Sequence, residues 1–400
     1  MNLKNIILGK LYAIGAVKRG EFVLKSGKRS SIYLDMRVII SYPNIYRDLL
    51  DLLLQRDPTF LNEIDSVTGI HFGGLPFANY ISFNRGLPQI YVRDSQKGYG
   101  TGKRIEGELK SRLLLVDDVL TTGGSINNVL HILDDYCVSP AKILVLVDRS
   151  EGEIPPFKYT ALFTLEEILN FQPKFYENPV SNTLWNNALN KRSNIIFSAD
   201  YSHKIDVLHA IDTVGPYVIG VKLHTDIIND FDDEFVVDLL KLREKHGLII
   251  IEDRKLGDIG AIALKQAEKF VWADAVTLHP IVGESVIQAL SNINVIPIVE
   301  MSSSGNLIDF KYTETALKMT KNKNVVGVVC QTKLRSPFDC LTMSPGIHLE
   351  KKADNLGQTY SNGSHSGLFW IVGRGISEGR ILEDAAQEYQ KAGWSHFKNY

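Results

Sequence analysis

Cysteine is scarce in this chain of 400 residues, which contains only Cys137, Cys330 and Cys340. Three cysteines this far apart exclude a disulfide framework and a cysteine-rich zinc site, so a reducing compartment is expected. Apolar runs long enough to cross a bilayer, roughly 18–20 residues, are missing as well. These absences predict a protein of the cytoplasm that does not enter a membrane.

An excess of charge of either sign is also lacking, because 44 basic residues face 46 acidic ones and leave a net charge of −2. That balance argues against a protein that coats nucleic acid or an anionic membrane. The hydrophobic share of 44% is ordinary for a globular chain. At about 150 residues per domain, the length predicts two or three domains.

The first part of the sequence alternates short apolar runs with amphipathic stretches. The predicted strands are 64–70, 88–92, 113–116 and 142–147, and the predicted helices are 45–55, 76–84 and 125–136. Strands that alternate with helices indicate a parallel sheet covered by helices. We therefore predict an α/β domain over residues 1–170, followed by an asparagine-rich linker at 171–192.

After residue 193, eight apolar runs follow one another, most of them with room for a helix behind. They cover 195–197, 218–223, 248–251, 275–278, 295–299, 325–330, 341–343 and 368–372. Eight such units match a small (β/α)₈ barrel, so we predict a TIM barrel over residues 193–400. Charged side chains follow most of these runs, and catalytic groups of such barrels gather at the C-terminal ends of the strands.

A string of carboxylates, hydroxyls and glycines directly follows the predicted strand 113–116. It contains Asp117, Asp118, Thr121, Thr122, Gly123, Gly124 and Ser125. The backbone N–H groups of such a turn and of the next helix can hold a phosphate, and the hydroxyls add donors. The two carboxylates can accept hydrogen bonds from ribose hydroxyls. An ordinary acidic cap would explain one aspartate and one glycine, but not the whole string.

This string resembles the phosphoribosyl pyrophosphate (PRPP) motif of the type I phosphoribosyltransferase family. The segments 22–33, 69–76 and 148–149 are similar to the hood, the pyrophosphate loop and the orotate contact of orotate phosphoribosyltransferases. The resemblance implies the type I fold, orotate and PRPP as substrates, and Mg²⁺ bound mainly through PRPP near Asp117 and Asp118. It also implies that Lys25, Tyr33, Arg93, Lys97, Tyr99 and Arg149 bind substrate.

The stretch 93–112 is rich in glycine and carries more basic than acidic residues, which suits a mobile lid over an anionic leaving group. The resembled family presents Arg-Lys-Glu-x-Lys here, whereas this chain has Asp94 in place of the first lysine. A carboxylate that faces pyrophosphate is repulsive. An alternative hypothesis is therefore that only the second domain is an active enzyme.

The third predicted barrel strand ends in a pair of charges, Asp253 and Lys255. Residues two apart on an extended chain point to the same side, and Lys222 at the end of the preceding strand can join them. With Asp258, the result is an array of alternating charges. Flanking carboxylates keep the Lys255 ammonium protonated, so it suits a proton donor better than a Schiff-base nucleophile. A plain salt-bridge cluster is the structural alternative.

The stretch from Asp253 to Gly260 resembles the Asp-Arg-Lys-x-x-Asp-Ile-Gly signature of the orotidine 5′-monophosphate (OMP) decarboxylase family. The resemblance implies that Lys255 protonates C6 of the pyrimidine while Asp253 lies against the departing carboxylate. Lys222 would complete the network with Asp258 from the neighbouring subunit, in a homodimer with shared active sites. The implied substrate-binding residues are Ser198, Asp200, His224, Ser302, Pro345, Gln358, Tyr360, Gly373 and Arg374. No metal or organic cofactor is implied for this half.

Together the two halves resemble the family of bifunctional uridine 5′-monophosphate (UMP) synthases. The expected function is pyrimidine biosynthesis, in which orotate becomes OMP and OMP becomes UMP, with small molecules as the only substrates. One departure is Ile262, where the family has a threonine whose hydroxyl contacts the ribose. A further alternative is that the N-terminal half only binds nucleotides or builds the dimer, because a fold does not fix a function.

Overall fold

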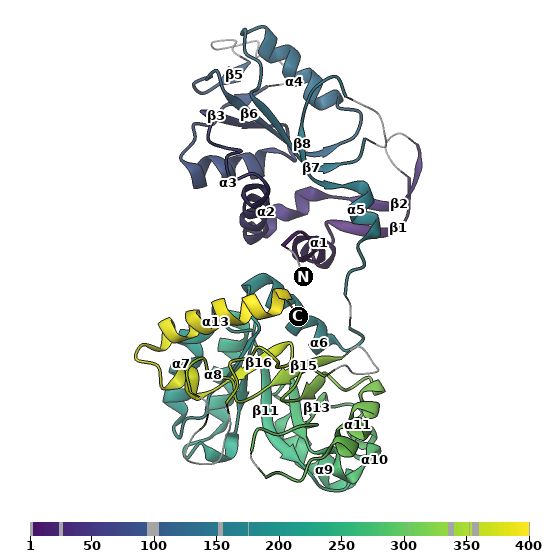
Figure 1. Cartoon of the computed structure of the whole chain (residues 1–400), viewed down its shortest axis with the longest axis vertical. Helices are drawn as coiled ribbons and strands as arrows, with labels where there is room; N and C mark the ends of the chain where they lie inside the picture. Colours follow the sequence, from purple (N-terminus) through teal and green to yellow (C-terminus); the bar gives the residue numbers. More distant parts are fainter. Residues whose placement is uncertain are drawn as a thin grey trace. The chain divides into compact units, whose positions relative to one another are not determined.

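The computed structural model describes residues 3–23, 27–93, 104–150, 155–174, 176–303, 305–334, 340–351, 353 and 360–399. The chain forms two compact units, Asn2–Lys174 and Phe175–Tyr400 (Figure 1). The segment predicted as a linker, 171–192, contains helix α6 (Pro179–Lys191), which belongs to the second unit. The helix forms here because Asn178 caps its first turn and Leu184 and Trp185 begin a buried apolar face.

The first unit is built on a four-stranded parallel sheet in the order β3-β6-β7-β8, with two short antiparallel pairs, β1-β2 and β4-β5. Its elements are α1 (Leu3–Ala13), β1 (Val17–Val23), β2 (Arg29–Leu34), η1 (Met36–Ser41), α2 (Pro43–Arg56), β3 (Ser66–Gly69), α3 (Leu75–Arg85), β4 (Tyr91–Val92), β5 (Ile105–Glu106), β6 (Leu113–Leu120), α4 (Gly124–Asp134), β7 (Lys142–Asp148), β8 (Thr160–Thr164) and α5 (Leu165–Asn170). The predicted parallel α/β domain is confirmed.

Strand β6 shows why the strands of this sheet appear in the sequence as continuous apolar runs. Leu114 and Val116 pack into one buried cluster with α2 and α3, while Leu113 and Leu115 pack into another with α4. A parallel strand that is covered on both faces needs apolar residues at every position. The strand continues to Leu120, beyond the predicted end at residue 116, so Asp117 and Asp118 lie within it.

In the second unit the described residues form eight parallel strands in the order β13-β12-β11-β10-β9-β16-β15-β14. The elements after α6 are β9 (Ile195–Ser198), α7 (Lys204–Val214), β10 (Gly220–Leu223), η2 (Thr225–Ile227), α8 (Asp233–His246), β11 (Ile249–Leu256), α9 (Gly260–Ala267), η3 (Glu268–Phe270), β12 (Ala275–Leu278), η4 (Pro280–Val282), α10 (Glu284–Ala289), β13 (Val295–Pro297), α11 (Phe310–Lys318), η5 (Met319–Lys321), β14 (Gly327–Val329), β15 (Leu341–Ser344), β16 (Phe369–Val372), α12 (Arg374–Ser377) and α13 (Leu382–Asn399). All eight strands coincide with predicted apolar runs.

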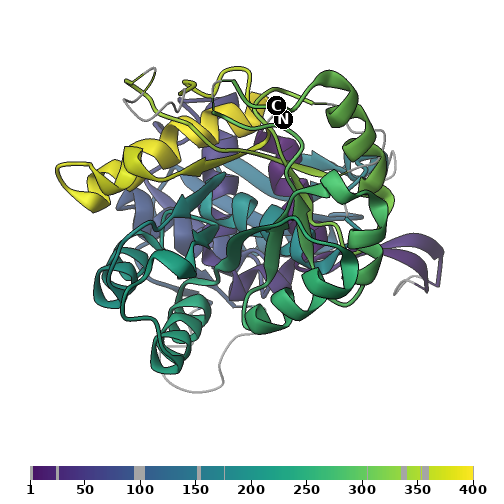
Figure 2. The ribbon, with the colours of Figure 1, turned by 90° about the horizontal axis from the view of Figure 1, so that it is seen from below.

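The strands close into a barrel. Isolated bridges join Val295 to Val325 and Ile298 to Val329, so β13 and β14, the first and last strands of this order, meet. Figure 2 shows the helices of this unit arranged around its strands. The TIM barrel predicted from the sequence is therefore present, and its strand ends converge on one face.

Strand β11 is irregular where it passes β12. Ile251 and Glu252 pair with Ala275 and Val276, but the next pair is Leu256 with Leu278. Three residues, Asp253 to Lys255, therefore lie opposite Thr277 alone. Lys255 adopts a left-handed conformation with φ of 53°, which is uncommon for a residue with a Cβ atom.

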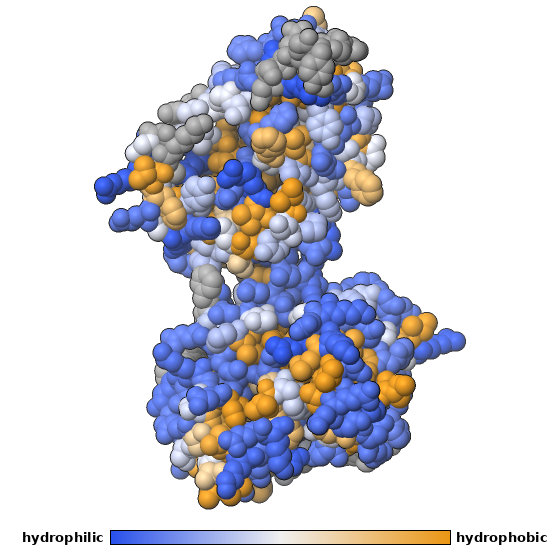
Figure 3. Space-filling view, turned by 180° about the vertical axis from the view of Figure 1, so that it is seen from behind, coloured by the Kyte–Doolittle hydropathy of each residue, from blue (hydrophilic) through white to orange (hydrophobic). Residues whose placement is uncertain are grey.

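The surface of each unit is mostly hydrophilic on the face shown in Figure 3, with apolar side chains in interrupted groups. Among the described residues, no helix has both the length and the apolar composition that a membrane span requires.

Candidate active sites

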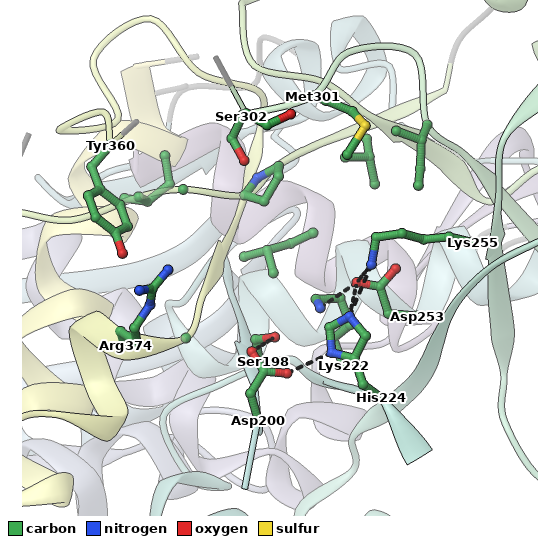
Figure 4. A pocket seen from close by; sticks show the side chains of 18 of the residues that line it. Ser198, Asp200, Lys222, His224, Asp253, Lys255, Met301, Ser302, Tyr360 and Arg374 are labelled. Carbon is green, nitrogen blue, oxygen red and sulfur yellow. Dashed lines mark hydrogen bonds and ion pairs between the residues drawn. The ribbon is translucent and has the colours of Figure 1, made fainter. Parts of the chain in front are cut away.

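A cavity of about 360 Å³ opens at the C-terminal ends of the barrel strands. It brings together most of the residues predicted for this half, as Figure 4 shows for ten of its lining residues. The predicted residues that line it are Ser198, Asp200, Lys222, His224, Asp253, Lys255, Ser302, Pro345, Tyr360, Gly373 and Arg374. Its volume lies at the lower end of the range for small-molecule sites, about 300–1,000 Å³.

Asp253 is the centre of the charged side of this cavity. Its Oδ2 atom lies 2.5 Å from Lys222 Nζ, 2.8 Å from Lys255 Nζ and 3.0 Å from His224 Nε2. Burial by itself would raise the pKa of the Asp253 carboxyl, but these three neighbours hold that pKa well below its usual range. Asp253 is therefore a fixed negative charge that two lysines and a histidine contact.

His224 connects this centre to a second carboxylate. Its Nδ1 atom lies 2.7 Å from Asp200 Oδ1, and the Ser198 hydroxyl donates to Asp200 Oδ2 at 2.9 Å. Burial would raise the pKa of Asp200, but His224, Lys222 and Ser198 lower it to about 2. Burial would likewise lower the pKa of His224, whereas Asp200 and Asp253 raise it above its ordinary value. Carboxylates and nitrogen-bearing side chains thus alternate along this wall of the cavity, where a ligand can contact them.

The opposite side of the cavity holds a separate cation. Arg374, the first residue of α12, lies with its guanidinium 5.6 Å from the centroid of the Tyr360 ring. In Figure 4 these two residues lie across the cavity from Asp253 and Lys255. Arginine is well suited to planar, bidentate recognition of phosphate and carboxylate groups. The cavity therefore fits a ligand with an anionic group at one end.

Two predicted residues are not part of this cluster. Asp258 is exposed, its Oδ1 accepts the Ile259 backbone N–H at 2.7 Å, and it does not line the cavity. Gln358 lies outside the described residues. Within one chain, therefore, three of the four charges in the predicted array come together: Lys222, Asp253 and Lys255.

Sequence reasoning missed Thr277, which donates its hydroxyl to Asp253 Oδ1 at 2.7 Å. Nothing in the apolar run 275–278 singled it out, because a threonine is an ordinary residue in a strand. Glu300 directly follows the predicted strand 295–299, and its carboxylate accepts the backbone N–H groups of Gln331 and Thr332, at 2.7 and 2.9 Å. Glu300 lines the cavity, and these bonds tie it to the chain that follows β14.

The first unit has its own candidate site at the C-terminal end of β6. Asp117 is buried and Asp118 is partly buried, and the loop before α3 packs closely against them. A Cβ atom on Gly73 would lie 2.1 Å from the Asp118 carboxylate, and one on Gly74 would lie 2.1 Å from the Val116 carbonyl oxygen. Glycine is therefore required at both positions for this loop to reach the strand end.

The other residues predicted for this site are partly in place. Thr121, Thr122, Gly124 and Ser125 follow β6 on the exposed side of the turn, and Gly123 caps α4 with φ of 77°. The guanidinium of Arg149 donates to Ser30 Oγ at 3.0 Å, and Tyr33 packs on Phe22 with ring centroids 5.5 Å apart. Arg93 pairs with Glu106 at 3.1 Å. Lys25, Lys97 and Tyr99, and also Asp94, lie outside the described residues.

Burial and, next to it, the neighbouring Asp118 carboxylate together raise the pKa of Asp117 to about 7. The unfolded chain titrates this group near its ordinary value of 3.8. The folded chain therefore binds the proton more tightly, and the stability that Asp117 contributes is complete below about pH 4 and lost as the pH rises through about 7.

We expect Asp117→Asn to raise the free energy of unfolding of the first unit by about 2–4 kcal/mol at pH 8, and to change it little at pH 4. Calorimetry measures the transition of this unit. All four tryptophans lie after residue 174, so tryptophan fluorescence follows the barrel alone. Asp134→Asn, at an exposed position of α4, is the matched control. A lower unfolding midpoint for Asp117→Asn at pH 8 would contradict this prediction.

Within the part of the chain that the structure describes, no group of three or more histidine, cysteine, aspartate or glutamate side chains is arranged to hold a metal ion. Asp117 and Asp118 offer two adjacent carboxylates, which are oxygen ligands of the kind that Mg²⁺ prefers. Such a pair fits an ion that takes most of its ligands from a bound substrate and from water.

Comparisons with known proteins give a match for each of the two units. The model of the orotidine 5′-phosphate decarboxylase / HUMPS family matches residues 193–389, and that of the phosphoribosyl transferase domain matches residues 39–178. Uridine 5′-monophosphate synthase of Bos taurus is 29% identical and is aligned over 99% of this chain and 97% of its own length. Orotidine 5′-phosphate decarboxylase of Rhizomucor pusillus is 35% identical over 52% of this chain and 87% of its own length. The crystal structure of orotate phosphoribosyltransferase from Aeropyrum pernix is 37% identical, covers 41% of this chain and 96% of its own, and superposes with a TM-score of 0.35.

Proposed function

Because the chain belongs to the orotidine 5′-phosphate decarboxylase family and carries a phosphoribosyl transferase domain ahead of the barrel, we propose that it makes UMP from orotate in two steps. The first unit transfers the phosphoribosyl group of PRPP to orotate and releases pyrophosphate. The barrel then removes CO₂ from the resulting OMP. The observation that carries the proposal is the cavity in which Lys222, Asp253 and Lys255 face Arg374.

In the first step, N1 of orotate loses its proton and forms a bond to C1 of the ribose, as the bond from C1 to the pyrophosphate oxygen breaks. The departing pyrophosphate takes up the proton. Thr121, Thr122 and Ser125 would bind the 5′-phosphate, and Asp117 and Asp118 the ribose hydroxyls. Arg149 would contact orotate. Mg²⁺, held mainly by PRPP oxygens near the two aspartates, would neutralise the negative charge of the leaving group.

In the second step, the bond from C6 of the pyrimidine to its carboxylate breaks and the electron pair stays on C6. Lys255 Nζ then gives a proton to C6. Asp253 would lie against the substrate carboxylate, and the repulsion between the two anions ends when neutral CO₂ leaves. Asp200 and His224 would bind the ribose, Ser302 the pyrimidine edge, and Arg374 with Tyr360 and Gln358 the phosphate. This chemistry uses only the protein's own groups.

We further propose a homodimer in which Asp258 completes the active site of the neighbouring subunit. Its support is the position of Asp258, which is exposed beside the mouth of its own barrel and does not line that barrel's cavity. A Lys-Asp-Lys-Asp array then requires a carboxylate from elsewhere. Three cysteines without disulfide spacing favour a reducing compartment, and we propose the cytoplasm.

The full chain supplied with orotate, PRPP and Mg²⁺ tests the whole proposal, with pyrophosphate, OMP and UMP measured separately. Release of pyrophosphate together with UMP supports both activities. If only added OMP is converted, the alternative of an active barrel beside an inactive first unit holds. If PRPP binds without release of pyrophosphate, the first unit is a nucleotide-binding module.

Ile262 lies on α9, where its side chain is exposed, and it replaces the family's threonine. We expect Ile262→Thr to lower the KM for OMP about two- to tenfold, because it adds a hydrogen bond to the ribose. Steady-state kinetics at several OMP concentrations measure this effect. Ile205→Thr, at an exposed position of α7, is the control. An unchanged or increased KM would contradict the ribose contact.

A further inference from the structure

Because β11 and β12 pair irregularly beside the reacting groups, some backbone polar groups of β11 lack a backbone partner on β12. Asp253, Arg254 and Lys255 lie opposite Thr277 alone, so one residue of β12 faces three of β11. The backbone of a single residue cannot satisfy the polar groups of three. Each buried backbone N–H that the ladder leaves unpaired needs another acceptor.

The side chain of Thr277 supplies that acceptor. Its Oγ1 atom accepts the Lys255 backbone N–H at 2.9 Å, and its hydroxyl proton is donated to Asp253 Oδ1 at 2.7 Å. The residue is 1% exposed, so solvent does not compete for either bond. One hydroxyl thus joins the backbone of Lys255 to the carboxylate of Asp253.

The two bonds have different consequences. Lysine in a left-handed conformation carries strain, and such a conformation persists only where the surroundings hold it. The bond to the Lys255 N–H provides part of that restraint. The bond to Asp253 Oδ1 fixes the rotation of the carboxylate, so that Oδ2 stays directed at Lys222, Lys255 and His224.

We propose that Thr277 is a positioning residue of the decarboxylase site, which sets the carboxylate of Asp253 and the ammonium of Lys255 relative to each other. The inference rests on the proposed function of the barrel. Thr277 does not line the cavity, so it acts through these two residues and not on the substrate. Its loss should therefore affect the chemical step more than the binding of OMP.

The test uses the full chain with Thr277→Val, Thr277→Ala and Thr277→Ser, and measures kcat and KM with OMP. We expect kcat to fall about 10- to 100-fold in the valine and alanine variants while KM changes less than about threefold, because small displacements of reacting groups have effects of this size. Thr277→Ser keeps the hydroxyl and should retain kcat within about threefold. If the valine variant does not fold, the alanine and serine variants give the same comparison.

Thr342→Val is the matched control, because Thr342 on β15 is also buried and its Oγ1 accepts the Leu368 backbone N–H at 2.9 Å. Thermal unfolding should show a similar loss of stability in both valine variants, with kcat retained only in Thr342→Val. The proposal is overturned if Thr277→Val or Thr277→Ala keeps kcat within about twofold, if serine does not rescue, or if only KM changes. A wild-type chain that does not decarboxylate OMP overturns the proposed function as well.

Discussion

Lys255→Ala should lower kcat for decarboxylation by about 10²- to 10⁴-fold, the usual contribution of a positioned general acid. With orotate, PRPP and Mg²⁺ supplied, OMP should accumulate where the wild type forms UMP. The physical reason is the place of the ammonium group, 2.8 Å from Asp253 Oδ2 and on the wall of the cavity. Among the described residues, Lys222 is the other lysine that contacts Asp253 on the wall of the cavity. It is a less suitable proton donor than Lys255, because it is more deeply buried against the same carboxylate.

The control for this change is Lys245→Ala on α8, which removes an exposed lysine paired with Asp212 at 2.6 Å. It should leave both activities unchanged. Release of pyrophosphate should also persist in Lys255→Ala, because the transferase site lies in the other unit. A Lys255→Ala chain that still decarboxylates OMP at the wild-type rate would contradict the assignment of the proton donor.

Arg374→Ala should raise the KM for OMP by about 10²-fold, because charge-assisted bonds from a guanidinium to a phosphate are lost. A comparison with orotidine, which has no phosphate, isolates the effect. The wild type should prefer OMP strongly over orotidine, and Arg374→Ala should lose most of that preference. The slow reaction of orotidine itself should change little in the variant. Kinetics with both substrates measure the ratio.

Arg380→Ala is the control for overall charge, because this arginine is exposed six residues further along the chain. It should leave the KM for OMP unchanged. Arg374→Lys should recover part of the binding, since lysine keeps the charge but lacks the planar pair of donors. If Arg374→Ala weakens orotidine as strongly as OMP, Arg374 does not bind the phosphate.

The fold was predictable from the sequence because both sheets are parallel and buried. Runs such as 113–116 and 195–197 are apolar throughout, which marks strands covered on both faces. The limits of elements were less visible. The predicted strand ended at residue 116, but the backbone continues its pairing with β7 beyond that point, through Asp117 with Val145 and Val119 with Val147. Polar residues at the end of a strand are tolerated where they face a site.

The site in the barrel was predictable in its composition but not in its construction. Asp253 and Lys255 meet as expected, at 2.8 Å, yet an extended strand is not the reason. The chain bulges between Glu252 and Leu256, and Lys255 takes a left-handed conformation. That geometry depends on Thr277, a residue 22 positions away along the chain. Spacing within one motif carries no information about the partner strand that holds it.

The bulge also bears on which changes in length the segment tolerates. Because three residues of β11 are matched to one of β12, the number of residues between Glu252 and Leu256 sets whether Leu256 still meets Leu278. A strand that slips by one residue turns its side chains to the opposite face. Deletions or insertions in 253–255 would thus remove the lysine from the cavity even if every remaining residue were kept, whereas substitutions leave the count intact. Evolution can therefore vary this segment by exchange of side chains, but hardly by change of length.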